Sequence, residues 1–200
     1  MQDIQLELRQ KIRQSIRKMR KELTEIQQQI AAQEIADKAI THPQITQAQN
    51  IALFLSFDGE IDTQPLIDKL WQQGKQVYLP VLHPFNRHNL LFLRYTPETL
   101  LVKNRFNIAE PSLDVTQVLP INDLDIMLIP LVAFDSEGQR LGMGGGFYDR
   151  TLSHWQQKNF YPIGLAHECQ QVEKLPCAHW DIPLPEIITP QKIWHWKNTY

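Results

Sequence analysis

The residues best suited to chemistry form a glycine-rich segment that ends in an aspartate. Residues 140–149 read Arg-Leu-Gly-Met-Gly-Gly-Gly-Phe-Tyr-Asp and hold four of the chain's eight glycines. Glycine lets backbone N–H groups approach a ligand closely and allows positive φ angles, so a glycine run beside an arginine and before a helix is typical of an anion site. Phosphate is the expected anion. A flexible surface loop is the alternative for such a stretch.

The segments on either side favour the phosphate site. Asp125–Phe134 is a nearly continuous apolar run of strand length, Asp135–Gly138 supplies turn residues, and Tyr148–Gln157 has the pattern of a helix with Asp149 in its first turn. Strand, glycine loop and helix is the order that phosphate sites use. The segment is neither a Walker loop, because it lacks Gly-Lys-Ser/Thr, nor a dinucleotide fingerprint, because Phe147 stands where that pattern needs glycine.

Three carboxylates are candidates for the same site. Glu60 follows a predicted strand in a glycine-containing loop, where it would face a polar ligand or would simply be an acidic turn residue. Asp149 lies so close to the expected phosphates that a bridging Mg²⁺ ion would be needed, although it would also suit a helix start. Asp181, before a proline-rich turn, is either a second magnesium ligand or an ordinary loop residue.

The N-terminal segment predicts a long basic helix. Residues 4–39 lack glycine and proline and carry apolar side chains at steps of three and four, which predicts one amphipathic helix, with a break near Leu23 and Thr24 as the alternative. Arg9, Arg13 and Arg17 share one face of it, and Arg20 lies close to that face. This face is either a solvated surface or a cationic arm that neutralises nucleotide phosphates.

Composition sets the broad class of the protein. The chain has 200 residues, 42% hydrophobic and 21% charged, with a formal net charge of −2, as in ordinary globular proteins, so disorder and a global bias toward nucleic acid are excluded. No apolar run reaches the length of a membrane span, which leads us to expect a cytoplasmic protein. The pattern His167-Glu-Cys169 with Cys177-Ala-His179 offers zinc-type ligands but lacks CxxC spacing, and we expect both cysteines to be reduced.

The remaining pattern predicts an α/β fold. Strand-like residues 51–57, a helix over 62–73 and a strand over 76–81 form a βαβ unit with parallel strands, residues 90–95 form an antiparallel or edge strand, and 161–166 add another. Residues 103–120 are expected to be irregular. We predict a single domain over residues 1–200, with a basic N-terminal helix (1–40) and an α/β core (50–190) whose mostly parallel sheet is flanked by helices.

Ligands of such sheets bind beyond the carboxyl ends of the strands. The Glu60 loop and the glycine loop both follow predicted strands, so we expect them to converge on one crevice. Aromatic side chains that could form its walls around a flat ligand are Phe54, Phe57, Phe106, Phe147 and Tyr148.

With these motifs in view, the chain resembles the 5-formyltetrahydrofolate cyclo-ligase family, whose members are also called 5,10-methenyltetrahydrofolate synthetases. The resemblance spans most of the chain. It rests on Arg-Gln-Lys-Ile-Arg at residues 9–13, Phe-Leu-Ser-Phe-Asp-Gly-Glu-Ile-Asp at 54–62, Phe-Asn-Ile-Ala-Glu-Pro at 106–111 and, most specifically, residues 130–149. It implies an α/β sheet related to the sugar-phosphate isomerase and CoA-transferase group, and a magnesium- and ATP-dependent cyclisation of 5-formyltetrahydrofolate that releases ADP and phosphate.

The resemblance also implies roles for individual residues. Magnesium would be bound by Asp149 and Asp181, and the folate by Leu55, Glu60, Phe106 and residues Met143, Gly144, Gly145, Gly146 and Phe147. ATP would be bound by Arg9, Gln10, Lys11, Ile12, Arg13, Arg140, Leu141, Gly142, Met143, Gly144, Gly145, Gly146, Phe147 and Tyr148. The implied partners are ATP and the folate, without nucleic acid, membrane or a second subunit, and no side-chain nucleophile is required.

This chain departs from the family pattern at three loop positions. Met143 and Gly145 stand where many members have a basic residue and a lysine, so two loop charges are missing and Arg140, the N-terminal arginines and the metal must neutralise the phosphates. Phe147 replaces a common tyrosine, which removes a hydroxyl. The alternatives are another ATP-dependent ligase or kinase that kept the loop, and an RNA-binding arm, which the lack of aromatic residues within 9–21 disfavours.

Overall fold

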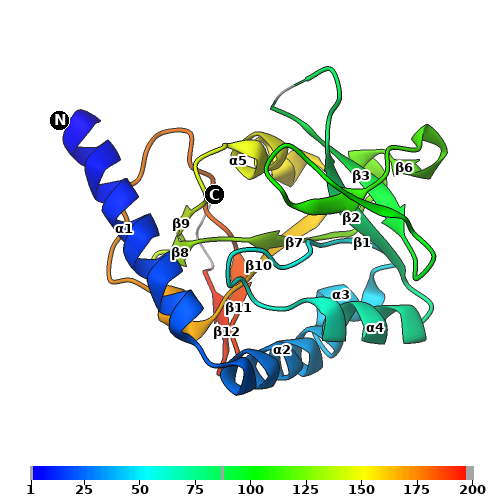
Figure 1. Ribbon diagram of the computed structural model, residues 1–200, viewed down its shortest axis with the longest axis horizontal. Helices are drawn as coiled ribbons and strands as arrows, with labels where there is room; N and C mark the ends of the chain where they lie inside the picture. Colours follow the sequence, from blue (N-terminus) through cyan, green and yellow to red (C-terminus); the bar gives the residue numbers. More distant parts are fainter. Residues whose placement is uncertain (1, 87, 197–200) are drawn as a thin grey trace.

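A computed structural model describes residues 2–86 and 88–196 (Figure 1). No helix among these residues is long and apolar enough to span a membrane. The helices are α1 (Gln2–Glu22), α2 (Glu25–Ile40), α3 (Pro43–Gln47), α4 (Gln64–Gln72) and α5 (Phe147–Leu152), and four short 3₁₀ turns lie at Val115–Gln117, Ile121–Asp123, Trp155–Gln157 and Glu168–Gln170. The strands are β1 (Asn50–Ala52), β2 (Gln76–Leu82), β3 (Leu90–Tyr95), β4 (Leu101–Lys103), β5 (Ala109–Pro111), β6 (Val118–Leu119), β7 (Ile126–Pro130), β8 (Ala133–Phe134), β9 (Arg140–Leu141), β10 (Tyr161–Leu165), β11 (Glu186–Ile188) and β12 (Ile193–His195).

Eight strands form the main sheet, in the order β12-β11-β10-β7-β1-β2-β3-β6. The inner strands β11, β10, β7, β1 and β2 pair in parallel, whereas β12, β3 and β6 add antiparallel edges. The predicted α/β sheet flanked by helices and the parallel β1-α4-β2 unit are therefore confirmed. β3 is antiparallel as predicted, although β6 covers its outer side.

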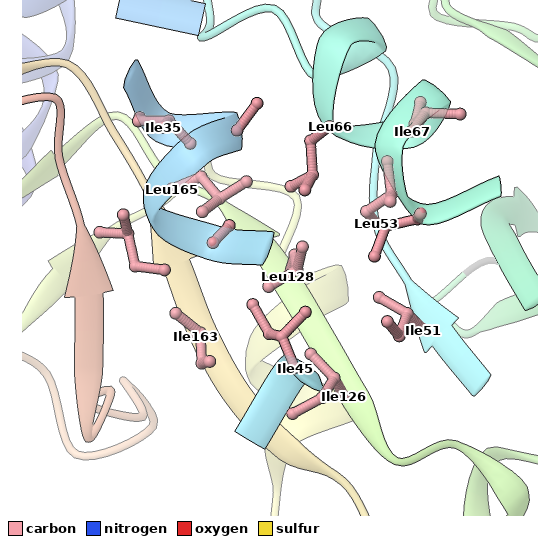
Figure 2. Packing of buried hydrophobic residues seen from close by; sticks show 14 of the residues in the cluster. Ile35, Ile45, Ile51, Leu53, Leu66, Ile67, Ile126, Leu128, Ile163 and Leu165 are labelled. Atoms are coloured by element: carbon pink, nitrogen blue, oxygen red, sulfur yellow. The ribbon is translucent and has the colours of Figure 1, made fainter. Parts of the chain in front are cut away.

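Both faces of the sheet are buried, and strand β7 shows how its sequence produces this. Successive side chains of a strand point to opposite faces. Ile126 and Leu128 join the core under α2 and α4, whereas Met127 and Ile129 join the core under α5. A strand buried on both faces must be apolar at every position, which explains the continuous apolar run. Figure 2 shows the first of these cores, where Ile35 of α2 and Leu66 of α4 face Leu128.

The N-terminal segment forms two helices, so the prediction of one continuous helix is wrong and its alternative, a break near Leu23 and Thr24, is confirmed. Thr24 caps α2 because its hydroxyl accepts a hydrogen bond from the Gln27 N–H at 3.2 Å, while the Gln27 side chain accepts the Thr24 N–H at 2.9 Å. This reciprocal pair satisfies the free N–H groups of a new helix. Helix α2 packs against α4 on one face of the sheet. Helix α1 lies at the side of the sheet, near β8 and β9 (Figure 1).

Helix α1 buries its basic face and exposes part of its apolar one. Arg9 and Arg20 are 8% and 0% exposed, whereas Ile4 and Leu8 are 70% and 47% exposed. Ile16 of α1 is buried in a small core, where it packs with Val132 and Leu141 of the segment that contains β8 and β9. The interpretation of the arginine face as a solvated surface is therefore wrong.

Several strand predictions need correction. The apolar run 125–134 is two elements, β7 and β8, and β1 ends at Ala52 because residues 53–57 leave the sheet and turn toward the next helix. Residues 103–120 contain β5, β6 and the end of β4; β4 and β5 form a hairpin closed by a turn at Asn104–Asn107. Its strands are mostly exposed and lack the alternation of apolar residues that would predict them. The predicted helix 148–157 ends at Leu152, since His154 has a φ of +55°.

Candidate functional site

One large cavity lies at the carboxyl ends of β1, β2 and β7. Its volume is about 1170 Å³. One side of it is formed by Pro130 at the end of β7, Leu131 after it, Leu82 of β2 and the segment 54–60 after β1. The glycine loop (residues 142–146) forms another side. The predicted convergence of the Glu60 loop and the glycine loop on one crevice is confirmed.

The glycine loop lies between the small hairpin β8-β9 and helix α5. The hairpin was not expected, and it places Arg140 and Leu141 in β9, before the loop begins. Gly144 has a φ of +102°, which only glycine adopts readily, and a side chain there would also meet the guanidinium of Arg13, whose Cζ lies 3.6 Å from the ideal Cβ position. Gly146 starts α5 in the left-handed region. The backbone shape of the loop thus requires glycine at positions 144 and 146.

A buried arginine, Arg140, lines the cavity just before the glycine loop. Arg140 is 4% exposed and donates from Nη2 to Asp149 Oδ1 at 2.6 Å. Burial lowers the pKa of Arg140, while the neighbouring Asp149 and Asp181 favour its charged form. Its buried Nε has no hydrogen-bond partner among the described residues. A buried and incompletely bonded cation is destabilising, so its presence in a cavity wall is a mark of anion binding.

Three arginines of α1 reach separate parts of the site. Arg9 makes a two-pronged ion pair with Asp181 and donates to the Pro176 carbonyl at 2.9 Å. Arg13 donates from Nε to the carbonyl oxygen of Gly142 at 2.8 Å. Arg20 bonds to the loop that precedes Glu60. Arg9 and Arg13 both line the cavity, so the basic face of α1 forms part of its wall.

The two candidate magnesium ligands, Asp149 and Asp181, differ in how many of their carboxylate oxygens are already hydrogen-bonded. Only Oδ1 of Asp149 accepts a hydrogen bond, from Arg140, and no hydrogen bond among the described residues reaches its other oxygen. Both oxygens of Asp181 are engaged, by Arg9 and by the Ala178 N–H at 2.8 Å. Within the described residues no group of three or more His, Cys, Asp or Glu side chains could hold a metal ion. Asp149 therefore fits a magnesium ion that takes its other ligands from substrate and water, whereas Asp181 fits only if Arg9 releases it.

The opposite wall carries a carboxylate with unusual surroundings. Glu60 lines the cavity and accepts a 3.2 Å hydrogen bond from the Phe57 N–H. Burial raises its pKa to about 7, although the positive charge of Arg20 acts in the other direction. Tyr148 of α5 lies between the two halves of the site, since its electrostatic neighbours are Glu60 and Arg140. Burial raises the pKa of Tyr148, which keeps its hydroxyl protonated.

Aromatic and apolar side chains complete the cavity. Phe106 and Phe147 meet edge to face with ring centroids 6.1 Å apart, and Arg105 lies 4.9 Å from the Phe106 centroid. Leu55 and Met143 line the cavity nearby. A partly apolar cavity with a few convergent polar groups is the usual form of a small-molecule site.

Comparison of the sequence with known proteins shows the family to which the chain belongs. The model of the 5-formyltetrahydrofolate cyclo-ligase family matches residues 5–190. The chain is 59% identical over 181 residues to the 5-formyltetrahydrofolate cyclo-ligase of Escherichia coli K12, covering 90% of this chain and 100% of the relative. It is 31% identical over 163 residues to the mouse protein of the same name, covering 77% and 79%. The chain belongs to the 5-formyltetrahydrofolate cyclo-ligase family. It is accordingly a ligase of folate metabolism, as the resemblance implied.

Solved structures of similar proteins agree with this family. The 5,10-methenyltetrahydrofolate synthetase of Aquifex aeolicus has a TM-score of 0.81 at 27% identity, covering 96% of this chain and 94% of that one. The corresponding protein from Mycoplasma pneumoniae has a TM-score of 0.72 at 23% identity, covering 91% and 98%, and supports the fold alone.

The structure brings together most, but not all, of the residues that the cyclo-ligase pattern implied. Those that line the cavity are Leu55, Glu60, Phe106, Arg9, Arg13, Arg140, Gly142, Met143, Gly144, Gly145, Gly146, Phe147, Tyr148 and Asp149. Gln10 and Lys11 are exposed outside it, Lys11 pairing with Glu7 at 2.7 Å. Ile12 and Leu141 pack together in the small core beneath α1. Asp181 lies next to the cavity, behind Arg9.

Two features of this cyclo-ligase site were missed in the sequence. His179 and Trp180 line the cavity. Both residues directly precede Asp181 in the sequence, and this position was the signal that could have indicated them. Asp58 binds three basic side chains of α1, which no local pattern indicates. The spacing that offered zinc ligands forms no metal group among the described residues, and Cys169 and Cys177 are free, as expected for reduced thiols.

Proposed function

We propose that the protein uses ATP to cyclise 5-formyltetrahydrofolate to 5,10-methenyltetrahydrofolate, with release of ADP and phosphate. The observation that carries this proposal is that the glycine loop, flanked by Arg13 and Arg140, and an apolar, carboxylate-bearing wall line one cavity. The names of the family and of the relatives compared above support the folate substrate. Because all these residues come from one chain, we propose that a monomer is active.

The nucleotide would occupy the glycine-loop side. Arg13 and Arg140 supply positive charge there, and the backbone N–H groups of residues 142–146 are open to a phosphate because most of these residues carry no side chain. Met143 and Gly145 contribute no charge. Phosphate neutralisation therefore depends on arginines that belong to β9 and α1.

The folate would occupy the side formed by Leu55, Glu60 and Phe106. A carboxyl group next to apolar walls suits a flat ring system with N–H donors at its edge. Phe147, the first residue of α5, meets Phe106 edge to face, so the two aromatic rings would hold the folate next to the glycine loop. This arrangement would hold the formyl group of the folate close to the γ-phosphate of ATP.

The chemistry needs no protein nucleophile. The formyl oxygen on N5 attacks the γ-phosphorus, the bond from phosphorus to the ADP oxygen breaks, and the formyl carbon becomes an imidoyl phosphate. N10 then attacks this carbon, loses its proton, and phosphate leaves as the ring closes. The protein would contribute by orienting both substrates and stabilising charge on the transferred phosphoryl group. Arg13 and Arg140 carry that charge stabilisation.

Magnesium, when bound with ATP, would neutralise phosphate charge, and Asp149 is the protein ligand that fits it. Arg140 orients Asp149 through their 2.6 Å hydrogen bond. The free oxygen of Asp149 then faces the phosphate side of the cavity in this proposal. Asp181 would act mainly by holding Arg9.

The test is direct. Purified protein with magnesium-ATP and 5-formyltetrahydrofolate should form the methenyl product, seen by its near-ultraviolet absorbance, with one ADP released per product. Absence of product with excess magnesium would overturn the proposal. ATP hydrolysis that depends on the folate but yields no methenyl product would instead indicate a different ligase.

A further inference from the structure

Asp58 lies at the centre of a cluster of three basic side chains from α1. Its carboxylate bonds to Arg17 Nε, to Lys21 Nζ at 2.5 Å and to Arg20 Nη2 at 3.3 Å. The Asp58 side chain is only 5% exposed. Burial alone would raise the pKa of this carboxyl, but hydrogen bonds from Arg17 and Lys21 lower it to about 2. Asp58 is therefore a buried, ionised anchor for the helix.

The same turn carries Glu60 into the cavity. Arg20 also donates to the Asp58 carbonyl at 2.9 Å, and an ideal Cβ on Gly59 would lie 3.3 Å from the Cβ of Arg20, so the turn lies directly against α1. Glu60 closes the turn, because its N–H donates to the Phe57 carbonyl at 3.1 Å and its carboxylate accepts the Phe57 N–H. Asp58 thus points to the helix and Glu60 to the ligand from one four-residue turn.

We propose that Asp58 is a positioning residue for the folate: it fixes the turn that aims Glu60 into the cavity and offsets part of the positive charge of the α1 cations behind it. This inference rests on the proposed function, in which Glu60 binds the folate. Asp58 does not line the cavity, so it acts through Glu60 and not by touching substrate. Nothing in this role involves the nucleotide half of the site.

The contacts of Asp58 with α1 also affect the charged groups around Glu60. The groups that face it are Arg20 from α1, Asp58 from its own turn, Tyr148 from α5 and the His167 ring after β10. Arg20 bonds to Asp58 and not to Glu60, so Asp58 offsets part of its charge. Removing the Asp58 charge would leave Arg20 free to stabilise the Glu60 carboxylate and would lower its pKa below about 7.

The test compares Asp58→Asn with wild type for each substrate. We expect KM for 5-formyltetrahydrofolate to rise roughly tenfold, the effect of a misplaced hydrogen bond to a charged group, and KM for ATP to change less than about twofold. The pH dependence of folate binding should move toward lower pH. Asp37→Asn is the matched control, since Asp37 of α2 forms an ion pair with Lys69 of α4 at 3.1 Å, and the Asp37 side chain is 59% exposed.

An equal rise in both KM values, or an unchanged folate KM and pH profile, would overturn the inference. If Asp58→Asn does not fold, Arg17→Gln takes its place, because the Arg17 side chain is 39% exposed and Arg20 and Lys21 still hold Asp58. It should raise only the folate KM, by roughly threefold, as expected for loss of a partly exposed ion pair; no selective rise would again contradict the inference. If the wild-type protein is inactive, the proposed function itself is refuted. Failure of the proposed function can therefore be distinguished from failure of the inference about Asp58.

Discussion

The Nε of Arg13 in α1 donates a 2.8 Å hydrogen bond to the carbonyl oxygen of Gly142, 129 residues away in the chain. This contact places a guanidinium directly over the glycine loop, next to Gly144. The loop lacks cationic side chains of its own, so α1 supplies the charge that its sequence omits.

The first prediction concerns this contact. Arg13→Ala should raise KM for ATP at least about tenfold, because a charged hydrogen-bond donor is lost, and should leave KM for the folate nearly unchanged. Steady-state kinetics with each substrate varied in turn measures both values. Lys18→Ala is the control on the same helix, since Lys18 is 78% exposed. Equal loss of both affinities would mean that the arginine serves the fold instead.

The second prediction concerns the missing loop lysine. A Cβ on Gly145 would lie 2.9 Å from the Phe147 ring, so Gly145→Lys must push this ring aside. We expect KM for ATP to fall roughly fivefold through one added, partly screened charge, and KM for the folate to rise as Phe147 moves. Gly145→Gln separates charge from size: it should disturb folate binding without improving ATP binding. Weaker ATP binding by the lysine variant would show that the loop cannot accept a side chain.

The third prediction concerns magnesium. Asp149→Asn should raise the magnesium concentration needed for half-maximal activity by roughly tenfold or more, because a carboxylate ligand is replaced by a weaker amide. Asp181→Asn should change it less, since Arg9 and the Ala178 N–H already occupy both oxygens. Activity titrated with magnesium at saturating ATP gives the comparison. A larger effect at Asp181 would mean that Arg9 releases this residue to the metal.

The fourth prediction concerns pH and stability. The pKa of Glu60 is raised from 4.5 to about 7, mainly by burial, so the folded protein holds a proton that the unfolded chain has lost between these values. This contribution to stability is complete below pH 4.5 and declines as pH rises through 7. Glu60→Gln, which cannot ionise, should therefore gain in Tm relative to wild type between pH 5 and pH 8. Thermal unfolding of both proteins at pH 5 and at pH 8 tests this, and Glu34→Gln, at an exposed position, is the control. If the difference in Tm between Glu60→Gln and wild type is the same at both pH values, the prediction is contradicted.

The glycine loop shows how far sequence patterns reach in the candidate site. Its glycines predicted positive φ angles, and the structure has them at Gly144 and Gly146. The pattern could not show that a hairpin, β8-β9, precedes the loop, because a two-residue strand carries no periodicity. It also could not separate Leu141 in the core from its cavity-lining neighbours. Whether each residue contacts a ligand stays a prediction.

The sequence by itself determined the features whose causes are local. The Thr24 cap, the apolar run of β7 and the βαβ unit each depend on residues close in the chain, so their signals lie within a short window. Only the tertiary structure decided that α1 buries Arg9 and Arg20. Their carboxylate partners are distant in the chain: Asp58 lies 38 residues beyond Arg20, and Asp181 lies 172 residues beyond Arg9. Burial of these two cations depends on carboxylates that the fold brings to them, and no local sequence pattern shows such a contact.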